Sequence, residues 1–71
     1  MKLNDLKIGD EGMIENVCVD ENIKTRLLDI GFIRGTLISP ILKNKSMTVF
    51  KIKGTIIGIR NEEVNNIEVS L

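Results

Sequence analysis

Short apolar segments separated by turn-forming residues constrain the fold of this chain more than any other feature. Val, Ile and Thr are concentrated in these segments, which is typical of β-strands. Between them stand glycines or polar residues such as Lys43–Ser46, which mark turns. The sequence therefore predicts five short strands, at residues 13–19, 36–42, 47–53, 55–60 and 67–71.

Two of these segments depart from regular alternation. Ile14 and Val17 are three residues apart, so residues 13–19 cannot keep both side chains on one face without a bulge or a strong bend. Pro40 lacks the N–H that a sheet ladder requires, so residues 36–42 form an edge strand or contain a bulge. Residues 61–66 are polar and fit a loop or a single helical turn.

One segment, between the first and second predicted strands, has helical periodicity. Ile23, Leu27 and Ile30 lie at positions i, i+4 and i+7 and form one apolar stripe. Asp20 is a suitable N-cap residue, and Gly31 stands where a helix ends in a residue of positive φ. We expect a short α-helix that tertiary packing must hold, because a helix of this length is unstable alone.

The chain of 71 residues is long enough for one domain, residues 1–71. Five short strands do not suffice for a two-layer sandwich of ordinary size, so we expect a mainly β fold that curls into a small barrel. Closure of the barrel would remove exposed strand edges. The helix would then cover one open end with Ile23, Leu27 and Ile30 pointing inward.

The side chains that usually carry out catalysis are scarce. The chain has no histidine, the residue that most often transfers protons near neutral pH. Cys18 has no histidine to activate it and lies in an apolar segment, so we interpret it as a small buried residue. A single cysteine fits the reducing cytoplasm. No apolar run approaches the roughly 18 residues of a membrane span, and the N-terminus lacks the apolar core of a signal peptide.

Metal and phosphate motifs are also missing. The carboxylates of the N-terminal half, Asp10, Glu11, Glu15, Asp20 and Glu21, lack the spacing of a calcium loop. No resident cofactor is therefore expected, and weak binding of a transition-metal ion is the most that these side chains would support. Gly31 and Gly35 follow the predicted helix instead of preceding it, so they do not form a phosphate-binding loop.

Charge is unevenly distributed along the chain. Ten basic residues balance ten acidic ones, which argues against nucleic acid as a partner, although a small nucleic-acid-binding barrel is an alternative. Residues 43–60 carry Lys43, Lys45, Lys51, Lys53 and Arg60 and no acidic residue. This segment is either a hairpin that meets an acidic partner or a solvated face whose lysines prevent edge-to-edge aggregation.

Four apolar side chains fall off the expected core face. Leu28 lies off the helical stripe, and Phe32 follows the glycine beside it. If Ile38, Pro40 and Leu42 face inward, Leu37 and Ile41 face outward. The four residues Leu28, Phe32, Leu37 and Ile41 would then form an exposed apolar patch of the kind that binds proteins. In the other interpretation the helix buries more than one face, and Leu28 or Phe32 belongs to the core.

The ordered set of motifs resembles the FeoA proteins of bacterial ferrous iron uptake. Three runs carry the resemblance: LNDLKIGDEGMI, IKTRLLDIGFIRGTLI and FKIKGTIIGIRNEEVNNIEV. The positions that match the family pattern are Leu6, Lys7, Gly9, Gly12, Arg26, Leu27, Leu28, Gly31, Phe32, Gly35, Gly54, Arg60, Glu62, Glu63, Ile67 and Val69. The chain departs from the family in one place, where a longer Gly/Pro-bearing segment between the second and third strands is shortened to LKNKSM.

The resemblance implies an SH3-like barrel and a cytosolic accessory protein of the membrane transporter FeoB, without catalysis by this chain and without membrane insertion. It also leaves a homo-oligomer and an iron-sensing domain, like those that end iron-dependent repressors, as alternatives. We expect docking through the helix and the Gly31–Gly35 turn, with Gly9, Gly12 and Gly54 at further structural turns. The candidate partner-binding residues are Arg26, Leu28, Phe32, Arg34, Leu37 and Ile41.

Overall fold

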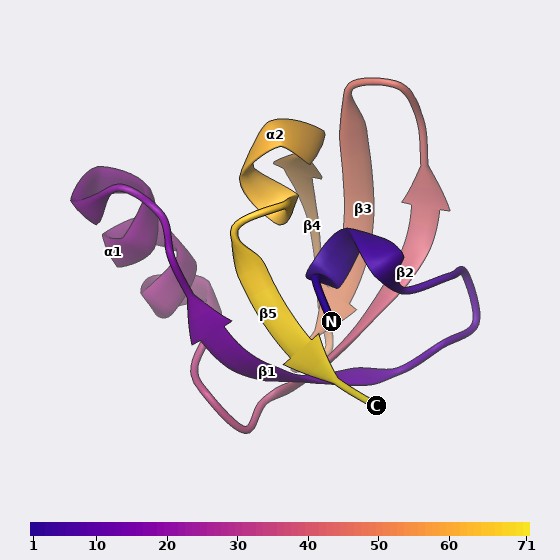
Figure 1. Ribbon diagram of the computed structural model, residues 1–71, viewed down its shortest axis with the longest axis horizontal. Coiled ribbons are helices and arrows are strands. Elements are labelled where there is room, and N and C mark those ends of the chain that lie inside the picture. The colour runs from indigo at the N-terminus through magenta and orange to yellow at the C-terminus, as the bar shows by residue number, and fades with distance from the viewer.

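A computed structural model describes residues 1–71 and contains five strands and three short helical segments. In chain order these elements are η1 (Leu3–Asp5, a 3-10 turn), β1 (Gly12–Val17), α1 (Glu21–Ile30), β2 (Leu37–Lys43), β3 (Met47–Ile52), β4 (Thr55–Arg60), α2 (Asn61–Val64) and β5 (Ile67–Ser70). Figure 1 shows the strands curling around a common interior. The mainly β class and the helix between the first two strands are confirmed. None of the helices is long and apolar enough to cross a membrane.

The five strands form one antiparallel sheet in the order β4-β3-β2-β1-β5. The sheet is curled as in a small barrel, but its end strands β4 and β5 do not pair with each other. The prediction that closure would remove both edges is therefore wrong. Residues 61–64 form the short helix α2, which connects these end strands across the opening (Figure 1).

Both predicted irregularities are present as bulges. The pairing of β1 with β5 shifts between Ile14 and Asn16, and the pairing of β2 with β3 shifts between Pro40 and Leu42. β2 is an internal strand, but it pairs with β1 only near its start, so Pro40 lies beyond that short ladder. The second bulge turns Leu42 outward to 57% exposure, which corrects the expectation that it faces inward.

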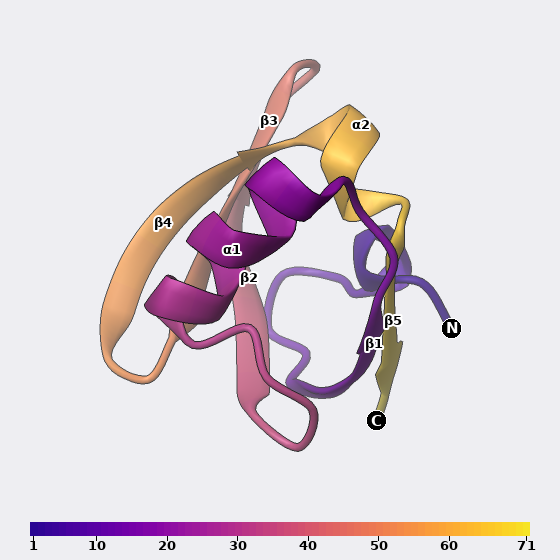
Figure 2. The same cartoon turned by 90° about the vertical axis from the view of Figure 1, so that its left-hand side faces the viewer.

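Helix α1 lies across the open side of the curled sheet, between β4 and β1 (Figure 2). Leu27 is buried, and Ile23 and Ile30 pack against the core, as the helical stripe predicts. Asp20 occupies the N-cap position, as predicted, although its side chain makes no capping hydrogen bond. Gly31 ends the helix at φ 116°, a conformation that glycine adopts without steric cost.

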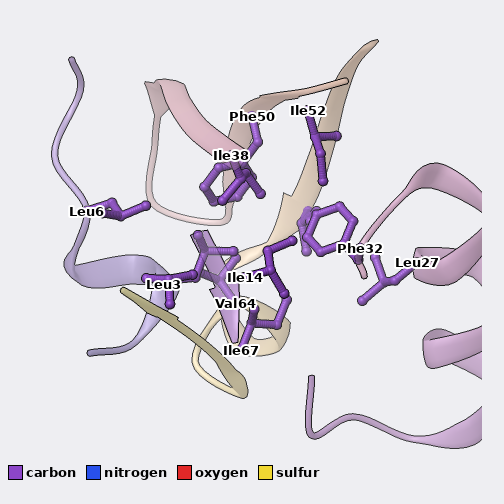
Figure 3. Packing of buried hydrophobic residues seen from close by; sticks show 12 residues of the cluster. Leu3, Leu6, Ile14, Leu27, Phe32, Ile38, Phe50, Ile52, Val64 and Ile67 are labelled. Carbon is purple, nitrogen blue, oxygen red and sulfur yellow. The ribbon is translucent and has the colours of Figure 1, made fainter. Parts of the chain in front are cut away.

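The interior is filled by twelve buried apolar residues drawn from nearly every element (Figure 3). The five strands contribute Ile14, Ile38, Phe50, Ile52, Ile59, Ile67 and Val69. The helical segments contribute Leu3, Leu27 and Val64, and the residues that follow η1 and Gly31 contribute Leu6 and Phe32. Full burial of such a side chain contributes about 1.5–3 kcal/mol, so these residues dominate the stability of the fold.

Cys18 lies on the surface instead of in the core. It follows β1, and the bulge between Ile14 and Asn16 changes which side chains of this segment face outward. The side-chain amide of Asn16 donates a hydrogen bond of 3.1 Å to the Cys18 sulphur. The interpretation of Cys18 as a buried residue is therefore wrong.

Hydrogen bonds from side chains hold the shortened segment between β2 and β3. The Asn44 side-chain oxygen accepts hydrogen bonds from the backbone N–H groups of Ser46 and Met47, at 3.0 and 2.8 Å. The Asn61 side chain donates to the Asn44 carbonyl at 2.9 Å and accepts from the Thr48 hydroxyl at 2.7 Å. The β2–β3 turn is thus tied to the start of α2.

Candidate functional site

The six candidate partner-binding residues come from three neighbouring segments. Helix α1 carries Arg26 and Leu28, the turn after it carries Phe32 and Arg34, and β2 carries Leu37 and Ile41. Five of the six are exposed, as predicted, but Phe32 is not.

Phe32 is buried, with 1% of its surface exposed, and points into the core beside Leu27 in Figure 3. The N–H of Phe32 donates to the Leu27 carbonyl at 2.9 Å, and the N–H of Gly31 donates to the Leu28 carbonyl at 3.1 Å. These two bonds form a Schellman motif, in which the residue after the glycine packs against the last helical turn. The prediction that Phe32 is a surface residue is wrong, and the other interpretation, that it belongs to the core, is confirmed. An apolar residue directly after a helix-ending glycine was the signal in the sequence for this packing.

Leu28 is the apolar residue of α1 that remains on the surface. Its exposed fraction is 45%, whereas Leu27 beside it is 5% exposed. Burial of Leu27 and Phe32 anchors this end of α1, so Leu28 is held at a defined place on the surface. Arg26 is also exposed and lines a shallow hollow of about 420 Å³ together with Arg60 and Glu63.

Leu37 and Arg34 both lie next to β1. Leu37 pairs with Met13 across the β1–β2 ladder, and both side chains are exposed, at 49% and 40%. Arg34 forms an ion pair with Glu15, with 3.7 Å between Nε and Oε2. The Ser70 hydroxyl donates to the other oxygen of the same carboxylate at 2.8 Å. An exposed pair of this kind contributes little stability.

Ile41 lies at the β2 bulge and faces a different neighbour. It lines a shallow hollow of about 560 Å³ with Ile8, and the carboxylates Asp10 and Glu11 lie at its rim. Ile8 is 56% exposed. Sequence reasoning did not include Ile8 and Met13 among the candidate partner-binding residues, and it assigned Met13 only to a strand. Their apolar character beside Gly9 and Gly12 was the available signal.

The surface hollows are shallow and lined mostly by polar residues. Four are present, with volumes between about 390 and 560 Å³. No group of three or more His, Cys, Asp or Glu side chains is placed to hold a metal ion together. Eleven large apolar side chains are exposed on the surface, among them Ile8, Met13, Leu28, Leu37 and Ile41.

Comparison with known proteins agrees with this fold. The family model for the FeoA domain matches residues 1–71. A protein of Campylobacter jejuni named "Putative Fe(2+) transport protein A" is 35% identical over 74 residues, covering 100% of this chain and 99% of that protein.

Two solution structures are similar to the chain over its full length. The FeoA protein from Chlorobium tepidum superposes with a TM-score of 0.90 at 25% identity, covering 100% of this chain and 70% of that one. The iron(II) transport protein A from Clostridium thermocellum gives a TM-score of 0.91 at 29% identity, covering 100% of this chain and 45% of that one. The chain belongs to the FeoA family, whose members are accessory proteins of ferrous iron transport.

Proposed function

We propose that this FeoA-family protein is a non-enzymatic cytoplasmic module that docks on the cytoplasmic GTP-binding region of the ferrous iron transporter FeoB and modulates it. The family match over residues 1–71 is the observation that carries this proposal. The matched relative named as an Fe(2+) transport protein supports a role in the same transport system.

The surface around Leu28 is the candidate docking site. An aliphatic side chain that is 45% exposed on an anchored helix presents apolar area in a fixed position, which favours protein binding. Arg26 on the same helix supplies a charge that can orient the partner. Leu37 and Ile41 are further exposed apolar residues, on β2.

Modulation follows from differential binding. A docking protein changes the nucleotide state or the assembly of its partner only if it binds one state more tightly than the other. This chain would act by contact, without a chemical step, so its effect on FeoB would saturate with its concentration.

Co-purification with a tagged FeoB tests the proposal. Leu28→Asp places a charge in the apolar contact but leaves the core untouched, so we expect a folded protein that no longer co-purifies. Asn22→Asp is the matched control, because it adds the same charge at an exposed position of α1 that lies about 120° away from Leu28 around the helix. Co-purification of Leu28→Asp at the wild-type level would show that the docking surface lies elsewhere. Failure of the folded wild type to co-purify would refute the proposed function.

A further inference from the structure

The two edges of the sheet differ in how they are covered. The outer edge of β5 is lined by the N-terminus: the N–H of Val69 donates to the Met1 carbonyl at 2.8 Å, and Lys2 forms a bridge with Glu68. β4 ends the sheet on the other side and pairs only with β3, through six residue pairs without a register shift. No strand lies on its outer side, as Figure 2 shows. The sheet therefore has one open edge.

The turn between β3 and β4 determines which backbone groups point to this edge. Lys53 and Gly54 have φ values of 48° and 76°, as in a type I′ turn, so Ile52 and Thr55 exchange backbone hydrogen bonds. Hydrogen-bonded and non-bonded pairs alternate along an antiparallel ladder. Ile56 and Gly58 consequently direct their N–H and C=O groups away from β3.

These backbone groups are accessible. Ile56 is 65% exposed, and Gly58 is exposed although it has no side chain, so solvent reaches its main chain. Neither residue takes part in a hydrogen bond outside the ladder with β3. Two adjacent donor–acceptor sites of a strand are thus free for pairing.

The sequence of β4 lacks the features that usually protect an open edge, and the one neighbouring element is helix α1, whose Ile23 and Arg26 line a hollow with Gly58 and Arg60. Natural edge strands carry proline, inward-pointing charge, lysine or a bulge, which hinder the addition of another strand. The segment TIIGIR has none of these before its last residue, Arg60. An unprotected edge of this kind is suited to recognition of an extended peptide.

The charge around the free edge of β4 indicates which kind of peptide strand this edge would bind. Residues 43–60 contain five basic residues and no acidic one. Arg26 and Arg60 line the hollow beside Gly58, with Glu63 as its only acidic residue. Pairing with β4 of a second copy would bring two basic hairpins together, whereas an acidic strand would be attracted.

We propose that the free edge of β4 binds an extended acidic peptide segment by strand addition, with pairing to the backbone of Ile56 and Gly58. Acidic side chains of the added strand would face Arg26 and Arg60. This site shares Arg26 with the surface around Leu28 but pairs through the backbone of β4, and the proposal stands whether or not that surface binds the transporter.

NMR spectroscopy of the ¹⁵N-labelled protein tests the proposal with a synthetic ten-residue peptide that alternates glutamate and valine. At saturation we expect shifts of the β4 amide signals and amide exchange at Ile56 and Gly58 that is at least about tenfold slower. A peptide with lysine in place of glutamate should bind at least about tenfold more weakly, because it loses the charge attraction. The acidic peptide with a methyl group on every backbone nitrogen should not bind, because both of its edges are then blocked for pairing with the strand.

Two substitutions at one position separate backbone pairing from side-chain effects. Ile56→Pro removes an N–H that the β3 ladder does not use and should abolish peptide binding, whereas Ile56→Thr keeps this N–H and should bind. Shifts confined to lysine side chains, without slower exchange in β4, would overturn the proposal. Equal binding of the lysine peptide would also overturn it, as would a dimer of the free wild-type protein in sedimentation measurements that Ile56→Pro converts to a monomer. If Ile56→Pro does not fold, titration of the wild-type protein with the N-methylated peptide tests whether binding requires backbone pairing.

Discussion

Truncation of Phe32 to alanine tests how the helix is attached to the barrel. Phe32 is 1% exposed and follows the glycine that ends α1, so its ring fixes the C-terminal end of the helix in the core. Phe32→Ala removes this ring and leaves a cavity between α1 and the sheet. The same truncation at Leu28, which is 45% exposed, removes a side chain that contributes little to the core.

The expected loss is large for a chain of this size. Phe→Ala in a core costs about 3–5 kcal/mol. At about 0.05–0.15 kcal/mol per residue, a domain of 71 residues has a free energy of unfolding of about 4–11 kcal/mol. At about 2.1 cal/mol/K per residue, the entropy of unfolding is about 150 cal/mol/K, so the loss lowers Tm by about 20–30 °C. Leu28→Ala should change the free energy of unfolding by about 0.5 kcal/mol.

Urea unfolding followed by circular dichroism measures both variants under the same conditions. We expect a lower midpoint for Phe32→Ala with little change in the slope, because the surface exposed on unfolding is nearly the same. A loss below about 1 kcal/mol for Phe32→Ala would refute the burial on which this reasoning depends. A loss at Leu28→Ala equal to that at Phe32→Ala would show that both faces of α1 are buried.

Two further substitutions test the contacts that shape the ends of the barrel. Gly31→Ala forces a side chain onto a residue at φ 116° and against Lys53, so the free energy of unfolding should fall by about 1–2 kcal/mol in urea titrations; no measurable loss would contradict the helix end described here. Lys43→Met removes the ammonium group that donates hydrogen bonds to the carbonyls of Leu6 and Asn4, so the free energy of unfolding should fall by about 1 kcal/mol and amide exchange near η1 should accelerate. Unchanged exchange in η1 would show that Lys43 does not hold this segment.

The regular elements could be predicted because their signals are local. Periodicity placed the strands and the helix, and glycine marked the end of α1 at Gly31. The bulges at Ile14–Asn16 and Pro40–Leu42 were also detectable, because broken alternation and a proline each conflict with a regular ladder.

The orientation of individual side chains near those irregularities could not be predicted. A bulge reverses the faces of the residues after it, and its exact place depends on the partner strand. Leu42 and Cys18 were therefore assigned to the wrong side. Phe32 was misassigned for a related reason, since the Schellman motif turns the chain back under α1.

The candidate surface was predictable only as a set of residue types. The sequence marked Leu28, Leu37 and Ile41 as apolar residues outside the core pattern, and all three are exposed. It could not show that Leu37 pairs with Met13 or that Ile41 lies beside Ile8, because these contacts join segments that are distant in the chain.

Calorimetric titration of the purified protein into its cognate FeoB, with bound GTP and with bound GDP, tests most directly whether this chain acts by contact. We predict saturable binding that differs between the two nucleotide states and that Leu28→Asp weakens at least about tenfold, a loss of about 1.4 kcal/mol. Absence of binding by the folded wild type in both nucleotide states would contradict the account.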